Sequence, residues 1–315
     1  MLSTPRHRQN TKHQTLKTVA ALLVCALVSS CTTPPEFNEA RAFADLERQV
    51  EFGARVPGSE PHAEALSFFV ETLEPLAERV IEQPVTWTSP LDSSIVFEGV
   101  NVIASFNLSN TSERIMLAAH WDSRQVADQD PDSTKRTLPV PGANDGASGV
   151  AVLLEMARLF ADQPPEAGID IVFFDLEDQG NLPGDSAMAS IPYALGSEIF
   201  VRDTPNYRPS YGILLDMVGD ANLRIPREAN SERYAKAVLD RVFEAAEAVG
   251  ADVFKDELGQ AIVDDHLPFL RKGIPVVDLI HTPFVPYWHT TEDTPDKCSP
   301  ESLGQVGEVL IELLY

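Results

Sequence analysis

Seven acidic and histidine side chains stand at the ends of rigid segments of the chain, and their types are those that bind zinc or move protons. They are His120, Asp122, Asp145, Glu177, Asp178, Asp216 and His289. Imidazole nitrogens and carboxylate oxygens are ligands that zinc accepts in proteins. Carboxylates whose pKa is shifted by neighbouring groups also serve as general bases. The set therefore indicates a zinc site with catalytic groups beside it.

Two of these positions have neighbours that favour metal binding. His120 and Asp122 are two residues apart at the end of a β-rich run, so both point to one side of an extended chain and the carboxylate can orient the ring. Asp145 lies within the glycine-rich segment 142–149, which allows the backbone to come close to an ion. A helix cap at Asp145 would not explain those glycines.

The adjacent carboxylates of Glu177 and Asp178 come after the mostly apolar run 168–174 and need a counter-charge, which a metal supplies. Taken singly, each residue of the set also has a structural explanation, as a strand-end histidine, a capped turn or a solvated loop acid. Their repeated occurrence at strand ends favours one shared site, because ligands bind at the carboxyl ends of strands in open α/β sheets.

Hydrophobic periodicity predicts the elements that must position this site. Strands are expected at 96–106, 114–119, 168–174, 211–218 and 274–280, the first two as an antiparallel pair joined by a turn. Helices are expected within 39–77, where Pro57 and Gly58 separate two of them, and at 147–160, 232–249, 265–271 and 300–314. The segment 125–142 is expected to be a surface loop.

This alternation predicts an α/β fold over residues 39–315. We expect a single-domain three-layer sandwich, with a mixed, mostly parallel twisted central sheet flanked by helices. The 315 residues hold no internal repeat that would indicate a second domain.

The N-terminus is predicted to be a secretion signal over residues 1–30, with basic residues followed by an apolar run at 18–27 that is too short to span a bilayer. The run ends at Cys31 in a sequence that resembles a bacterial lipobox, so residues 31–38 would be a lipidated tether. We expect the protein to be anchored in the bacterial cell envelope, facing the periplasm or the exterior. An uncleaved anchor helix is the alternative.

The charge of the chain excludes one class of partner. It carries 48 acidic and 24 basic side chains, for a net charge of −24. This balance repels phosphate backbones and anionic lipid surfaces, so no nucleic acid is expected as a partner and the membrane is expected to be contacted only through the lipid anchor.

The order of these motifs resembles the M28-like zinc aminopeptidase clan. Within that clan, the segment 264–275, which begins Asp-Asp-His-Leu-Pro-Phe-Leu, and the segment 279–290, which ends Tyr-Trp-His-Thr, closely resemble the glutaminyl-peptide cyclotransferases. The segment Arg55-Val-Pro-Gly-Ser59 is similar to that family as well. Such enzymes convert the N-terminal glutamine of a peptide to pyroglutamate and release ammonia, so the resemblance implies peptide or protein substrates with a free N-terminus.

The resemblance implies a role for each site residue. Asp145, Asp178 and His289 would hold one zinc ion. Glu177 would take a proton from the attacking amine and return it to the departing ammonia, and Asp264 would orient the amide nitrogen. Asp216 would belong to the acid network behind Glu177, and Trp288 would form an apolar wall that excludes water.

Three departures from the cyclotransferase pattern concern the substrate pocket and the metal. Asp278 stands where the animal enzymes have a histidine, and Gly180-Asn-Leu-Pro183 stands where a tryptophan is expected. Asp178 replaces the usual glutamate ligand; its shorter side chain needs a closer backbone.

Two other functions remain open from the sequence. An M28-type aminopeptidase would hold two zinc ions bridged by Asp145, with His120 and Asp216 on the second ion, and would activate water for hydrolysis. A peptide-binding lipoprotein without catalysis would be expected to lack Glu177, which is present. Trp288 and Asp264 favour cyclisation, for which one zinc ion is expected.

Overall fold

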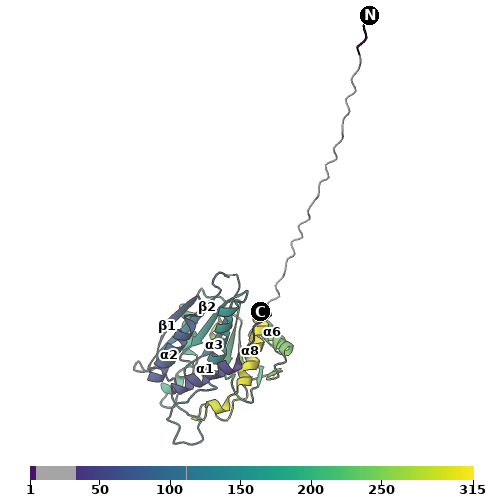
Figure 1. The fold of residues 1–315 in the computed structure, drawn as a ribbon. Coiled ribbons are helices and arrows are strands. Elements are labelled where there is room, and N and C mark those ends of the chain that lie inside the picture. Colours follow the sequence, from purple (N-terminus) through teal and green to yellow (C-terminus); the bar gives the residue numbers. More distant parts are fainter. Residues whose placement is uncertain (5–32, 111) are drawn as a thin grey trace. The chain divides into compact units, whose positions relative to one another are not determined.

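A six-stranded sheet runs through the middle of residues 34–315 (Figure 1). Its strands, in spatial order, are β1 (Arg79–Thr88), β2 (Val96–Phe106), β4 (Gly168–Phe174), β3 (Arg114–His120), β5 (Tyr211–Asp216) and β8 (Val276–Ile280). Strands β4, β3, β5 and β8 are parallel, whereas β2 is antiparallel to both of its neighbours. The predicted mixed, mostly parallel sheet is confirmed.

The computed structural model describes residues 1–4, 33–110 and 112–315. Most of the predicted signal segment 1–30 and the predicted lipidation site Cys31 lie outside these residues. Within the described part of the chain, no helix has the length and apolar character needed to cross a membrane.

The predicted pairing of β2 with β3 is wrong. Strand β4 lies between them, antiparallel to β2 and parallel to β3, and the other partner of β2 is β1. Strand β1 was not predicted, because it lies at the edge of the sheet and most of its side chains are partly exposed, so it lacks a clear apolar pattern.

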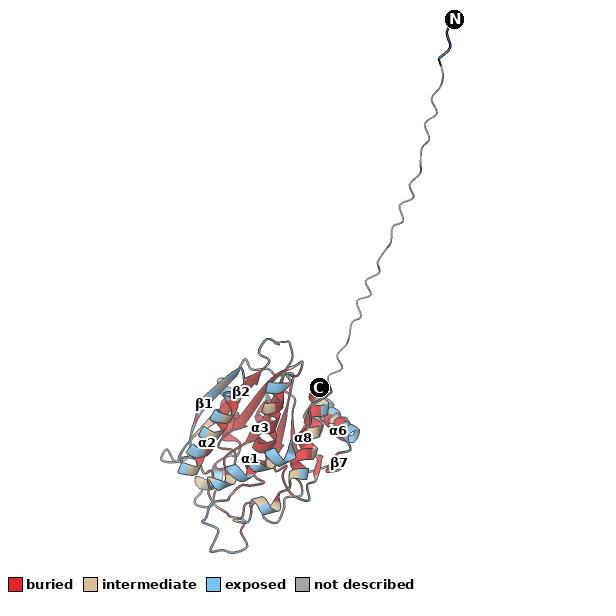
Figure 2. Ribbon diagram, in the orientation of Figure 1, coloured by how far each residue is buried: buried red, intermediate tan, exposed pale blue. Residues whose placement is uncertain are grey.

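Helices cover both faces of this sheet, which confirms the three layers. The side chains of β3 alternate between them: Ile115, Leu117 and Ala119 pack in one core cluster, and Met116 and Ala118 in the other. The first cluster is covered by α1 (Glu39–Glu51), α2 (Glu60–Leu73), α3 (Ala147–Asp162), α6 (Lys236–Val249) and α8 (Pro300–Leu314). Helices α4 (Leu195–Asp203) and α7 (His266–Arg271) cover the second. The central strands are almost wholly buried, while outer helices such as α1, α2 and α6 expose one face (Figure 2).

The remaining elements correct the predicted boundaries. The predicted helix 232–249 is two helices, α5 (Ala229–Tyr234) and α6, interrupted at Ala235. Helix α4 was not predicted. A separate pair of short strands, β6 (Ile225–Arg227) and β7 (Phe254–Leu258), lies outside the main sheet. The segment 125–142 contains no helix or strand, as predicted.

Candidate active site

The site lies at the edge where the parallel strands β3, β4 and β5 have their carboxyl ends. His120 is the last residue of β3 and Asp216 the last of β5, while Glu177 and Asp178 follow β4. Because these strands are adjacent and parallel, their ends meet at one edge of the sheet. Asp145 joins them from the loop before α3, and His289 from the loop after β8.

One group of potential metal ligands consists of Asp145, Asp178 and His289, whose donor atoms lie within 4.8 Å of one another. His289 Nε2 is 3.0 Å from Asp178 Oδ1 and 3.7 Å from Asp145 Oδ2. Its Nδ1 faces Asp128 Oδ1 at 3.6 Å. One nitrogen thus faces the ligand group and the other faces an outer carboxylate, which is the arrangement that orients a metal-binding histidine.

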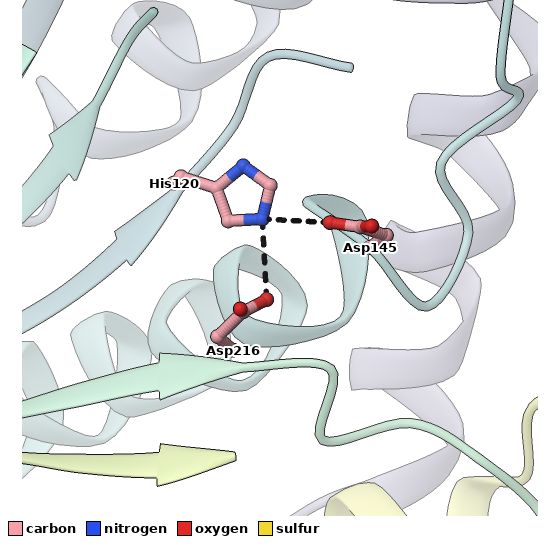
Figure 3. A group of neighbouring side chains, drawn as sticks. All are labelled: His120, Asp145 and Asp216. Carbon is pink, nitrogen blue, oxygen red and sulfur yellow. Dashed lines mark hydrogen bonds and ion pairs between the residues drawn. The ribbon is translucent and has the colours of Figure 1, made fainter. Parts of the chain in front are cut away.

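A second group shares Asp145 with the first (Figure 3). His120 Nε2 is 3.1 Å from Asp145 Oδ1 and 3.2 Å from Asp216 Oδ1. Its Nδ1 faces Asp122 Oδ1 at 3.7 Å, so this histidine repeats the arrangement of His289. One carboxylate oxygen of Asp145 faces each histidine. Asp145 is therefore placed to bridge two metal positions.

The charges of these groups fit a bound cation. Burial opposes a charged imidazole, but Asp178 and Asp128 together raise the pKa of His289 to about 9. Asp122, Asp145 and Asp216 likewise raise the pKa of His120 well above its ordinary value. The buried carboxylates thus favour positive charge at both places, and oxygen and imidazole donors in this number suit zinc.

Asp122 holds more than the ring of His120. Its Oδ1 accepts a hydrogen bond from the backbone N–H of Glu177 at 3.0 Å, and its Oδ2 accepts one from the N–H of Asp178 at 3.2 Å. Oδ2 also accepts from Nε2 of Gln179 at 3.0 Å. A single buried carboxylate therefore connects β3 to the acid pair after β4, and it positions both members of that pair.

Glu177 lies beside the two ligand groups but belongs to neither of them. Its side chain is buried and lines the cavity described below. Burial and the charge of Asp264 raise the pKa of Glu177 well above its ordinary value. A carboxyl group in this state has a high affinity for a proton, as a base that accepts and returns one requires.

Asp264 precedes α7, and its Oδ2 has no hydrogen-bond partner among the described residues. Burial and the charge of Asp216 raise its pKa to about 7. Asp216 itself contacts His120, so it belongs to the second ligand group, and its charge also acts on Asp264.

The backbone is strained at three points of this site. Leu176, Met217 and His289 have φ values of 60°, 49° and 54°, a region that non-glycine residues rarely adopt. The first precedes Glu177 and the second follows Asp216. Such a conformation costs free energy and is kept only where the surrounding structure enforces it. Residues of this kind are common at functional sites.

Two buried residues that the sequence analysis did not assign a role hold the loop of Asp145. Arg55 donates hydrogen bonds to the carbonyl oxygens of Trp121, Pro141 and Gly142 at 2.9, 3.0 and 2.6 Å. Asp293 accepts hydrogen bonds from the backbone N–H groups of Asn144 and Asp145. The motif around Arg55 was the available signal; Asp293 lies too far along the chain for any local pattern to connect it to Asp145.

The glycines of this loop are required by the same packing. Gly142 and Gly146 have φ values of 70° and 104°. A Cβ atom on Gly142 would lie 2.8 Å from Nη2 of Arg55, and one on Gly146 would lie 2.7 Å from the carbonyl oxygen of Asp122. The N-cap residue of α3 is Gly146, and no side chain caps the helix. Asp145 therefore does not cap α3.

Arg55→Met is expected to lower the free energy of unfolding by at least about 2 kcal/mol, because it removes three hydrogen bonds from buried backbone carbonyl groups. Urea denaturation would measure this. Arg48→Met is the matched control, since Arg48 forms an exposed pair with Glu51 that contributes little. Equal urea midpoints for the two variants would contradict the role given to Arg55.

A cavity of about 930 Å³ opens onto the first ligand group. Asp145, Asp178 and His289 reach it together with Glu177. Trp288 lines it and stacks on the ring of His289, with ring centroids 3.7 Å apart. The ring of Phe284 packs against Trp288 in a tilted arrangement, with ring centroids 4.5 Å apart. Apolar rings therefore lie directly beside a candidate metal ligand.

The departures noted in the sequence have defined positions. Asp278 is fully buried, and its donor atoms and those of Asp264 and His266 lie within 4.8 Å of one another. Burial and the charge of Asp264 raise the pKa of Asp278 well above its ordinary value. At the place of the missing tryptophan, Gly180 is covered by the ring of Tyr193, which lines the cavity.

Comparison with known proteins places this geometry in a family. A model of peptidase family M28 matches residues 101–314. Bovine glutaminyl-peptide cyclotransferase is 28% identical over 243 residues, which are 67% of this chain and 64% of that protein. The chain thus spans less than two thirds of that curated relative.

Two solved structures match nearly the whole described chain. A leucine aminopeptidase precursor from Bacteroides thetaiotaomicron has a TM-score of 0.85 and 37% identity, covering 90% of this chain and 98% of that one. A glutaminyl cyclase from the same species, bound to N-acetylhistamine, has a TM-score of 0.85 and 36% identity, covering 90% and 99%. With the family model matching more than half of its residues, the chain belongs to peptidase family M28.

Proposed function

We propose that this protein is a zinc-dependent glutaminyl-peptide cyclotransferase. The observation that carries the proposal is the aromatic wall beside the ligand group: Trp288 lines the cavity and stacks on His289. Cyclisation competes with hydrolysis, so an enzyme that closes a ring must keep water away from the reacting carbonyl. The similarity to bovine and bacterial glutaminyl cyclases supports the same activity.

The reaction joins the α-amine of an N-terminal glutamine to the carbonyl carbon of its own side-chain amide. A zinc ion held by Asp145, Asp178 and His289 would polarise that carbonyl group. Glu177 takes the proton that the amine loses as the new C–N bond forms. It returns this proton to the amide nitrogen, which leaves as ammonia when the old C–N bond breaks. The product is pyroglutamate.

The other side chains position the substrate and the base. Asp264 carries a buried oxygen without a partner, which can accept a hydrogen bond from the amide nitrogen. Asp122 holds the backbone of Glu177 and Asp178, so the base and a ligand keep a constant separation. Trp288 and Phe284 exclude water from the attacked carbonyl.

A two-zinc aminopeptidase is the second candidate, and one observation favours it. The second ligand group of His120, Asp145 and Asp216 is complete and buried, with Asp145 facing both histidines. Two metals bridged in this way would activate a water molecule for peptide hydrolysis. The leucine aminopeptidase precursor among the similar structures is consistent with this alternative.

A pair of substrates separates the two candidates. Purified protein is incubated with a Gln-initiated peptide and, separately, with an aminoacyl-anilide, each with and without a metal chelator. We expect pyroglutamate formation, measured by mass spectrometry, that the chelator abolishes and added zinc restores. Cleavage of the anilide without pyroglutamate formation would reject the cyclotransferase, and activity toward neither substrate would favour a peptide-binding role.

We also propose that the protein works outside the cytoplasm, anchored through a lipid on Cys31 and facing the periplasm or the exterior. The support is the basic and apolar N-terminal segment with its lipobox-like end. Metabolic labelling with a radioactive fatty acid tests this proposal: label is expected in the full-length chain and not in Cys31→Ser. Equal labelling of both would refute it.

A further inference from the structure

Tyr193 occupies a position in the cavity that the proposed chemistry leaves unassigned. The cavity has apolar side chains from separate parts of the chain, among them Trp87, Ile199 and Ile262. Tyr193 contributes an aromatic ring to this lining on the side of Asp178, while Trp288 contributes one on the side of His289. Aromatic rings thus adjoin two of the three ligands of the first group.

The ring of Tyr193 lies directly on the backbone of Gly180, two residues after Asp178. A Cβ atom at Gly180 would lie 2.4 Å from Cγ of Tyr193 and 2.5 Å from Cδ2, which is closer than atoms can approach. Any other residue at this position would force the ring to move. Only glycine at position 180 therefore allows the ring to lie where it does.

The backbone on the other side of Tyr193 is also fixed. Ala194 has a φ of 60°, and its N–H donates to the carbonyl oxygen of Glu177 at 3.0 Å. The N–H of Leu195 donates to the carbonyl oxygen of Leu176 at 3.1 Å. The segment that carries Tyr193 is therefore hydrogen-bonded to the same strand end that carries the proposed base.

Arg124 supports the same ring. Its guanidinium carbon is 5.7 Å from the centre of the Tyr193 ring. The buried guanidinium group also donates to the carbonyl oxygens of Asp178 and Gly180, both at 3.0 Å. A cation this close to an aromatic ring stabilises it where it stands. Gly180 and Arg124 thus both contact the ring, and the side chain of Tyr193 is half-buried.

We propose that Tyr193 is a substrate-positioning residue that, with Trp288, holds the side chain of the N-terminal residue over the first ligand group. This inference rests on the proposed function. A flat aromatic face accepts the methylene groups and the planar amide of glutamine by stacking contact. The contribution comes from the ring, so the hydroxyl group is dispensable.

The test compares Tyr193→Ala and Tyr193→Phe with the wild-type protein, all loaded with zinc. We expect Tyr193→Ala to raise KM for a Gln-initiated peptide about tenfold or more, with a smaller change in kcat, because stacking on the ring is lost. Tyr193→Phe restores KM to within about threefold of wild type because it keeps the ring. Zinc content and Tm are expected to stay at wild-type values in both variants. The matched control is Tyr234→Ala, since Tyr234 is 58% exposed on α5.

An unchanged KM in Tyr193→Ala would overturn the inference, as would an increase in KM accompanied by loss of zinc or of thermal stability. A second measurement separates this inference from the proposed function. Binding of N-acetylhistamine, the compound bound in the similar Bacteroides structure, is measured by calorimetry without turnover. If the wild type makes no pyroglutamate, the proposed function fails. Weaker binding to Tyr193→Ala than to wild type would still support the aromatic position, and equal binding would reject it.

Discussion

Glu177→Gln is expected to lower the rate of pyroglutamate formation by about 10²–10⁴-fold while leaving the zinc content unchanged. Glutamine has the shape of glutamate but cannot take the proton that the attacking amine must lose. Zinc is expected to remain because Glu177 lies outside the group formed by Asp145, Asp178 and His289. The measurements are kcat with a Gln-initiated peptide and zinc per chain by elemental analysis.

Glu177→Gln is also expected to be at least as stable as the wild type. Glu177 is buried near other acids, and burial with the charge of Asp264 raises its pKa. A neutral glutamine removes this repulsion, so Tm is expected to be equal to or above that of the wild type. Glu113→Gln, an exposed position before β3 at the opposite edge of the sheet, serves as the control. If Glu177→Gln keeps its activity, the base is another residue; if it loses zinc, Glu177 is a ligand.

His289→Ala and His120→Ala are expected to have different effects, because only His289 belongs to the group beside the aromatic wall. We expect His289→Ala to lose the zinc of that group and to lower cyclase turnover by about 10³-fold, since a bound metal supplies several kcal/mol of stabilisation and 1.4 kcal/mol is a factor of ten. His120→Ala is expected to retain one zinc ion per chain and most of the cyclase activity.

His281→Ala is the matched control for this pair, because His281 is buried and lies outside both ligand groups. The zinc content of each variant is compared with its rates toward the Gln-initiated peptide and the aminoacyl-anilide. If both His120→Ala and His289→Ala abolish activity and each removes one of two zinc ions, the protein uses a bridged pair. That result would favour the aminopeptidase.

The central strands and the acids that follow them were predictable from local patterns. Strand β4 is apolar except for Asp170 and is buried on both faces, and Glu177 and Asp178 follow its end after two intervening residues. Parallel strands have their carboxyl ends at one edge of the sheet. Predicting these strands was therefore enough to predict that Glu177 lies near His120 and Asp216. The helices with long amphipathic patterns, such as α3 and α8, were predictable for the same reason.

The elements that escaped prediction have weak local signals. Strand β1 is an edge strand with one buried side chain, so its pattern differs little from that of a loop. Helix α4 has only nine residues and lacks a side-chain cap at its start. The pairing of β2 with β1 and β4 depends on which strands come together in space. The short turn between β2 and β3 suggested a hairpin that the sheet does not form.

The sequence by itself determined which residues could bind metal and which strand ends carry them, because those features depend on neighbours along the chain. Only the tertiary structure decided how they are used. It turned one oxygen of Asp145 toward each histidine, placed Asp128 behind His289, and brought Arg55 and Asp293 against the loop of Asp145. It also covered Gly180 with Tyr193. These contacts join distant residues, and their geometry results from packing among many buried side chains, which no local pattern encodes.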